Sequence, residues 1–203
     1  MKKSQFFLVI LTNLLLIGCV PMRPATNMPS NKVVTWPIRQ QGLQQITNWQ
    51  LSGAVAVRTP QKAFSASVNW QQQKNSCCYT LNLLGPLGIG AVILTGNATQ
   101  ITLQEDNGQI YTASTPEQLL QLHLGWQLPI ANLYYWVRGL PAPNAPAQMS
   151  FDSFNHVTSL QQQGWQITYL SYTGVGLYDL PNKIFMRNGP VQIRLVISTW
   201  RVQ

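Results

Sequence analysis

The cysteine at position 19 has the surroundings of a thiol that is modified. It ends an apolar run that begins at Phe6, and Lys2 and Lys3 precede that run. A basic start, an apolar stretch of about a dozen residues and a small residue before the cut are typical of a secretory signal. The stretch is shorter than the roughly 20 apolar residues that cross a bilayer. We therefore predict a signal peptide over residues 1–18.

The four residues Leu16-Ile17-Gly18-Cys19 resemble the bacterial lipobox. In that motif the cysteine becomes the first residue of the mature protein, so the resemblance implies covalent diacylglyceryl and N-acyl groups on Cys19. Each buried CH₂ adds about 0.8 kcal/mol, so two or three acyl chains form a lasting anchor. Val20 stands where an Asp commonly retains lipoproteins in the inner membrane of enteric bacteria, which favours the outer membrane. The alternative is an ordinary signal peptide with an incidental cysteine.

Residues 19–36 are rich in Pro, Asn and Ser and show little apolar periodicity. This composition predicts a lipidated N-terminus followed by a flexible tether. Residues 37–203 are long enough for one domain with a substantial core, and we predict a single domain there.

The amino-acid composition limits the classes of molecule that the protein is expected to bind. Charged residues make up 9% of the chain, against about 25% in typical soluble domains, and 45% is hydrophobic. The formal net charge is +8, but Lys and Arg are scattered along the chain. Scattered cations argue against nucleic acid and favour attraction to anionic lipid or to an acidic partner.

The sequence shows no catalytic or metal-binding pattern. His123 and His156 are distant in sequence from any Cys or carboxylate cluster, and the five acidic residues form no obvious pair. No serine-nucleophile elbow, phosphate loop or His-Glu-x-x-His motif occurs. Cys77 and Cys78 are interpreted as two thiols at the start of a strand, because a disulfide between neighbours would be strained. We therefore expect no enzyme activity and no bound metal.

Alternating apolar residues predict about ten short antiparallel strands. Residues 51–58 and 64–70 each alternate, with a turn between them, which is typical of a hairpin. Asp106-Asn107-Gly108 and Asn188-Gly189 are further tight-turn signals. The segment 173–177 is expected to be a loop. The other strands are expected at 79–83, 89–94, 101–103, 110–113, 149–154, 157–162, 165–169, 183–187 and 191–202, the last with Thr199 on its inward face.

Short helices interrupt the strands. One is expected from Pro37, and Thr115 with Gln118 three residues later forms a capping-box start for a second that stops at Gly125. A third is expected over residues 130–138. The side chains expected to face the core are Ile38, Leu43 and Ile46 in the first helix and Ile130, Leu133, Tyr134 and Val137 in the third.

These elements predict a mainly β fold with short α: an incomplete antiparallel β-barrel of about 10–11 strands. Curled strands of this number enclose more volume than their own side chains fill, so we expect an apolar cavity with a helical lid. An ordinary filled core is the alternative. The candidate wall residues are Val55, Val57, Val68, Trp70, Leu81, Leu83, Ile101, Leu103, Ile167, Ile193, Leu195 and Ile197, and the candidate lid residues are Leu119, Leu122, Leu133, Tyr134 and Trp136.

Five segments after the lipobox carry a family resemblance. They are Trp49-Gln50-Leu51-Ser52-Gly53, Val68-Asn69-Trp70-Gln71-Gln72, and residues 81–88 (LNLLGPLG), 108–113 (GQIYTA) and 136–141 (WVRGLP). In order and spacing they are similar to the outer-membrane lipoprotein receptor family LolB. Ala54, where many members have Arg, and the Cys77-Cys78 pair depart from the family pattern.

The resemblance implies an incomplete barrel lidded by helices. It implies a lipid-anchored receptor in the outer membrane, facing the periplasm, that accepts lipoproteins from a soluble periplasmic carrier of the LolA type. Their acyl chains would occupy the cavity before insertion into the inner leaflet of the outer membrane. We expect a monomer. A lipid-anchored structural or adaptor lipoprotein without a ligand cavity is the alternative.

The segment Gly85-Pro86-Leu87-Gly88 predicts a turn, with Pro86 at its second position and Leu87 at its tip. An apolar side chain at a loop tip has two interpretations. It folds back onto the sheet, or it is a hydrophobic finger that enters the bilayer. The resemblance favours the finger, since the matching loop leucine of the family is assigned that role.

Overall fold

The computed structural model of the chain describes residues 28–30, 32–73, 78–97, 100–125 and 128–203. The predicted signal peptide, Cys19 and Cys77 lie outside these residues. Within them, eleven strands form one sheet in which every pairing is antiparallel. The strands are β1 (Trp49–Arg58), β2 (Ala63–Gln73), β3 (Cys78–Leu84), β4 (Val92–Gly96), β5 (Ile101–Glu105), β6 (Ile110–Ala113), β7 (Gln148–Phe151), β8 (Val157–Gln162), β9 (Trp165–Val175), β10 (Tyr178–Asn188) and β11 (Val191–Val202).

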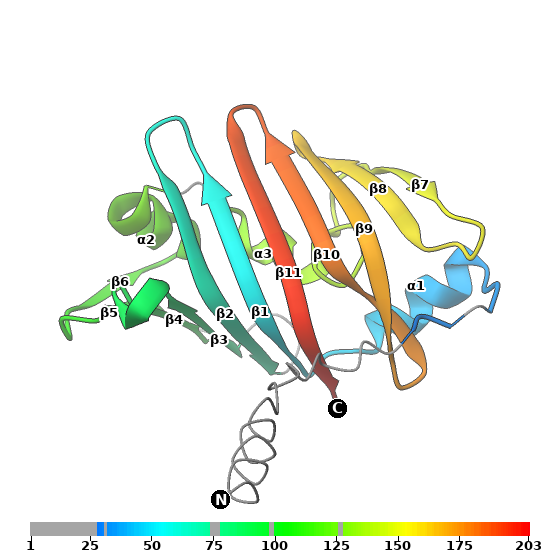
Figure 1. Ribbon diagram of the computed structural model, residues 1–203, viewed down its shortest axis with the longest axis horizontal. Helices are drawn as coiled ribbons and strands as arrows, with labels where there is room; N and C mark the ends of the chain where they lie inside the picture. Colours follow the sequence, from blue (N-terminus) through cyan, green and yellow to red (C-terminus); the bar gives the residue numbers. More distant parts are fainter. Residues whose placement is uncertain (1–27, 31, 74–77, 98–99, 126–127) are drawn as a thin grey trace, which may run out of the picture.

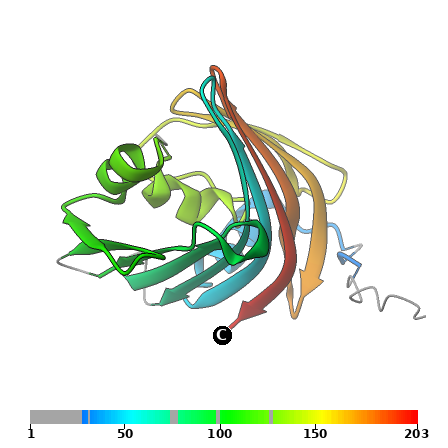
Figure 2. The ribbon, with the colours of Figure 1, turned by 60° about the vertical axis from the view of Figure 1, so that its left-hand side comes forward.

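The strand order explains where the helices lie. The order is β6-β5-β4-β3-β2-β1-β11-β10-β9-β8-β7, so the chain runs outward from β1 to one edge and restarts at the other. The connection between the two edges carries α2 (Pro116–Leu119), η2 (Leu120–Leu124) and α3 (Ile130–Trp136). It crosses the concave side of the curled sheet, as Figures 1 and 2 show. The edge strands β6 and β7 do not pair, which confirms the incomplete barrel.

Alternation builds the concave face. In β2, Ala66, Val68 and Trp70 are buried, while the residues between them lie toward the convex side. The β1–β11 register shifts between Ser52 and Gly53, where a Cβ on Gly53 would lie 2.0 Å from the carbonyl oxygen of Val196. Only glycine permits this approach.

The same register shift corrects one prediction. It pairs Leu51 with Trp200, so Trp200 is buried and Thr199 is exposed. The prediction that Thr199 shares the inward face is therefore wrong, because a bulge breaks the period of two.

Helix α1 (Trp36–Gln44) starts with Pro37 in its first turn, as predicted. Leu43 and Ile46 are buried, but Ile38 is 62% exposed. The prediction for Ile38 is wrong because the buried face of the helix includes Arg39, which pairs with Asp179.

The other two predicted helices are present, but the first of them changes its geometry part of the way along. The Thr115 hydroxyl accepts a hydrogen bond from the Gln118 backbone N–H at 3.4 Å. After α2 the helix widens into η2, a π-helical turn that ends at Gly125 with φ 72°. The loop predicted over 173–177 is wrong, because β9 and β10 pair up to Val175 and Tyr178 and leave a two-residue turn. Among the described residues, no helix has the length and apolar character that crossing a bilayer requires.

Candidate functional site

An apolar hollow of about 60 Å³ lies between the sheet and the crossing helices. Every side chain that borders it is apolar. The sheet contributes residues from β1, β2, β3, β10 and β11, and the crossing connection contributes the rest. The bordering residues are Val55, Val57, Val68, Trp70, Leu81, Leu83, Leu120, Leu128, Ile130, Leu133, Val137, Met186, Ile193 and Leu195.

The structure brings many of the predicted wall and lid residues to this hollow. They are Val55, Val57, Val68, Trp70, Leu81, Leu83, Leu133, Ile193 and Leu195. Leu120, Leu128, Ile130, Val137 and Met186 also border it but were not proposed. Ile130 and Val137 lie on the helical face that periodicity identified, so that signal could have found them.

The remaining candidates border no part of the hollow. Tyr134, Trp136, Ile167, Ile197, Leu103 and the half-buried Ile101 pack in the core. Leu122 is 78% exposed and borders an open cleft beside the hollow rather than the hollow itself. The π-helical turn bonds i to i+5 rather than i+4, which turns Leu120 inward instead. Leu119, buried on the same connection, borders a separate cleft.

The hollow is small in this conformation. About 60 Å³ is room for only a few water molecules. A fatty acyl chain is several times larger. A chain can therefore enter only if the crossing helices move away from the sheet.

An open cleft of about 1150 Å³ lies next to the hollow. Edge strand β6, the α2–η2 helices and the β8–β9 turn surround it. Leu128 borders both the cleft and the hollow, and it is 6% exposed. Leu128 is thus the lining residue that the two spaces share.

The predicted finger is a turn, η1 (Pro86–Gly88), between β3 and β4. The Gly88 backbone N–H donates to the Gly85 carbonyl at 3.1 Å, and Leu87 is 98% exposed. The alternative in which Leu87 folds back onto the sheet is wrong. Leu87 has φ 59° and ψ 19°, a left-handed conformation that costs a non-glycine residue roughly 1–2 kcal/mol.

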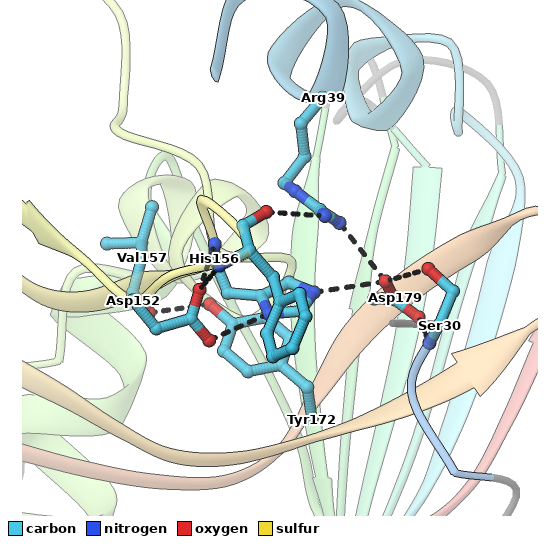
Figure 3. A network of polar contacts seen from close by, with 8 residues as sticks. Ser30, Arg39, Asp152, His156, Val157, Tyr172 and Asp179 are labelled. Carbon is cyan, nitrogen blue, oxygen red and sulfur yellow. Dashed lines mark hydrogen bonds and ion pairs between the residues drawn. The ribbon is translucent and has the colours of Figure 1, made fainter. Parts of the chain in front are cut away.

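A buried polar network lies on the other side of the barrel, where Figure 3 shows its residues. His156 is 2% exposed, with Nδ1 2.9 Å from Asp152 Oδ2 and Nε2 3.0 Å from Asp179 Oδ2. Asp179 also accepts hydrogen bonds from Ser30 N and Oγ, both at 2.7 Å, and from Arg39 at 3.3 Å. The network fixes α1 and the segment before it to β10.

Electrostatics in this network favours the charged forms of the two aspartates. Each ring nitrogen of His156 faces a carboxylate oxygen. Burial alone would raise the pKa of Asp179, but hydrogen bonds from His156, Ser30 and Arg39 hold that pKa below its usual value. The pKa of Asp152 is also lowered, since hydrogen bonds from His156 and Phe154 outweigh its burial. The sequence analysis did not identify this cluster, because Asp179 is far from His156 along the chain. The four-residue spacing of Asp152 and His156 was the one local signal.

His123 is also paired. Its Nδ1 lies 3.4 Å from Glu105 Oε1, and its ring packs on Tyr111, so it joins η2 to the β5–β6 hairpin. Within the ranges that the structure describes, no group of three or more His, Cys, Asp or Glu residues could hold a metal ion. His156 links Asp152 to Asp179, and His123 links η2 to the β5–β6 hairpin.

Comparison with known families gives a match over most of the chain. Residues 47–200 match the family model LolB, described as outer membrane lipoprotein LolB. A relative from Coxiella burnetii (strain Dugway 5J108-111), named outer-membrane lipoprotein LolB, is 40% identical over 194 residues, covering 95% of this chain and 91% of its own. One of the same name from Nitrosococcus oceani is 37% identical and covers both chains completely.

Solved structures share the fold at low identity. A LolA superfamily protein from Nitrosomonas europaea has a TM-score of 0.53 at 12% identity and covers 84% of this chain and 94% of its own. A putative outer membrane lipoprotein-sorting protein domain from Vibrio parahaemolyticus has a TM-score of 0.51 at 8% identity, covering 80% and 90%. These likenesses concern the fold alone.

Proposed function

The chain belongs to the LolB family, and on that premise we propose that it receives lipoproteins from a periplasmic carrier and inserts them into the outer membrane. It is an outer-membrane lipoprotein, a member of a family of lipoprotein transport. We further propose that Cys19 carries the acyl groups that anchor it, that it faces the periplasm, and that it works as a monomer.

The physical problem in this function is to move acyl chains without exposing them to water. Exposure costs on the order of 0.8 kcal/mol per CH₂, so the chains must pass from one apolar site directly to another. The observation that carries the proposal is a hollow bordered only by apolar side chains inside an incomplete barrel. A receiver that binds the chains more tightly than the carrier makes the transfer downhill without nucleotide.

The geometry supports a route for the chains. They would enter the open cleft beside β6, displace Leu128 and spread between the sheet and α3. The crossing connection is suited to this movement, because its contacts with the wall of the hollow are apolar and can be replaced by contacts with the ligand. The alternative, an adaptor lipoprotein without a ligand cavity, is less well supported, since an adaptor does not need an apolar hollow.

Release would use the finger. Leu87 is held outward in a strained turn, so its exposure is fixed by the backbone rather than by a flexible side chain. Leu84 and Ile89 flank the turn and are 46% and 72% exposed. Insertion of this apolar tip into the inner leaflet would bring the loaded barrel to the bilayer.

A transfer assay tests the two steps separately. Full-length protein in proteoliposomes is given a radiolabelled lipoprotein on its soluble carrier. Val68→Phe adds volume at the wall of the hollow and should reduce loading by tenfold or more. Leu87→Glu should load normally but deposit no lipoprotein in the bilayer.

Leu177→Glu is the matched control, because Leu177 is 97% exposed in the β9–β10 turn. It should load and deposit like the unchanged protein. Normal loading of a folded Val68→Phe variant would contradict the acyl site, and normal deposition by Leu87→Glu would contradict the finger.

A further inference from the structure

Three buried hydrogen-bond donors on neighbouring strands have no acceptor among the residues that the structure describes. They are the indole Nε1 of Trp49 on β1, the indole Nε1 of Trp70 on β2 and the hydroxyl of Tyr79 on β3. Their residues are 3%, 4% and 9% exposed. The Trp49 and Trp70 ring centroids are 5.1 Å apart, and those of Trp70 and Tyr79 are 6.4 Å apart. The three rings thus pack together as one aromatic cluster.

Comparable groups elsewhere in the core have partners. Trp136 donates to Gln162 and Trp200 to the Pro181 carbonyl, both at 2.8 Å. The Tyr169 hydroxyl donates to the Trp136 carbonyl at 2.8 Å. A buried donor without an acceptor is destabilising, so three together require an explanation.

The cluster adjoins the apolar hollow. Trp70 borders the hollow directly, and Tyr79 packs its ring over Gly96 on β4, where a Cβ would be 2.3 Å from a ring carbon. Trp49 packs against Tyr134 of α3. Movement of α3 away from the sheet would therefore uncover both the hollow and the aromatic cluster.

The cluster selects acceptors without charge. An indole can only donate, and burial together with the Glu117 carboxylate raises the pKa of Tyr79 well above its usual value, so the phenol keeps its proton. The nearby cation Arg138 is engaged with the Leu43 and Ile46 carbonyls, and its guanidinium lies over the Tyr134 ring. A buried anion would find no counter-charge here, whereas carbonyl oxygens would.

A lipoprotein's acyl chains carry such oxygens where they join its N-terminal cysteine: two ester carbonyls and one amide carbonyl. We propose that Trp49, Trp70 and Tyr79 form a subsite for these carbonyls. The subsite rests on the proposed function, because it presumes that acyl chains enter the hollow. The subsite sets how deeply the acyl chains enter the hollow. It also favours acyl chains, which have carbonyl groups, over alkyl chains, which lack them.

The test compares two lipopeptides that differ only in linkage. One carries two ester-linked chains on its glyceryl-cysteine, and the other carries two ether-linked chains of equal length, which lack carbonyls. Competition against a fluorescent acylated peptide measures their affinities for the full-length protein. The unchanged protein should prefer the ester by about fivefold, the value of one hydrogen bond. Tyr79→Phe should lose most of that preference while its affinity for the ether stays the same.

Infrared spectra of ¹³C-labelled ester carbonyls provide a readout that packing alone does not move. The carbonyl band should lie lower in frequency when bound to the unchanged protein than when bound to Tyr79→Phe. If Tyr79→Phe folds poorly, replacing the Trp70 indole by benzothiophene removes an N–H with little change of shape, and the same loss is expected.

The outcomes are distinguishable. Equal affinity for ester and ether, with the same carbonyl band in both proteins, would overturn the subsite and leave the acyl-chain site standing. Such a result would mean that water or ring faces satisfy the donors. Failure of both lipopeptides to bind would overturn the subsite together with the proposed function.

Discussion

The two sides of the barrel treat buried polar groups in opposite ways. On the β8–β10 side, Gln162 makes four hydrogen bonds, to Trp136, to the backbone of Ala142 twice and to Ala145. Asp179 accepts from three residues, and among the buried side-chain polar atoms that the structure describes on that side only Nε of Arg39 lacks a partner. On the β1–β3 side, three donors lack acceptors and the packing leaves a hollow.

The β8–β10 side therefore acts as a rigid frame, and the β1–β3 side as the surface that receives a ligand. Satisfied polar networks hold one geometry, because each group depends on the position of its partners. Apolar contacts are not directional, so a ligand can replace them at small cost. The β8–β10 side, with α1, can then stay fixed while the crossing helices give way.

The largest effect is expected at Arg138, which is 1% exposed and ties the end of α1 to α3. Arg138→Met would remove the Arg138 hydrogen bonds to the Ile46 carbonyl and to the Leu43 carbonyl, which keeps the Ile46 backbone N–H as a donor, and would also remove the contact with Tyr134. We expect a loss of about 3 kcal/mol in the free energy of unfolding, measured by urea denaturation. Arg194→Met, which removes only a contact with the Phe185 ring, is the control and should cost less than about 1 kcal/mol. Equal losses would show that the frame does not depend on Arg138.

A smaller effect is expected from pH. The lowered pKa values of Asp152 and Asp179 mean that their stabilisation is complete above the unfolded pKa of about 4 and is lost as pH falls through the folded values. Asp179→Asn should cost about 2 kcal/mol at pH 7 and flatten the dependence of stability below pH 4. Thermal unfolding at pH 3 and pH 7 measures both. An unchanged slope in the variant would refute the role of the network.

The smallest effect, and the sharpest contrast, is expected from removing single hydroxyl groups. Tyr79→Phe removes a donor without an acceptor, so ligand-free protein should become more stable by up to about 1 kcal/mol. Tyr172→Phe removes a hydroxyl that donates to the Val157 carbonyl at 2.7 Å and should lose about 1 kcal/mol. Urea midpoints compare the two variants. Destabilisation by Tyr79→Phe would mean that the hydroxyl is satisfied.

The sequence predicted what depends on local periodicity. Alternation placed Val57, Val68 and Leu81 on the concave face, and turn chemistry placed Leu87 at an exposed tip. The antiparallel sheet and the crossing helices followed from the same signals. These features depend on neighbours within a few residues.

The sequence did not predict features that depend on distant pairing. The bulge at Gly53 and the π-helical turn that exchanges Leu122 for Leu120 shift the phase of a regular pattern. The Asp179–His156 network joins residues far apart along the chain, and no periodicity reports it. The size of the hollow depends on how side chains from opposite walls interlock, which one strand's pattern does not contain.

The two hydrogen bonds from Ser30 to Asp179 have a consequence for how far the protein can stand from its membrane. They move the point of attachment from the start of α1 to Ser30, eleven residues after Cys19. Fully extended, that segment reaches roughly 40 Å at most. On the proposal that Cys19 carries the membrane anchor, this length limits how far the barrel stands from the bilayer, and breaking the Ser30 contact would increase that distance.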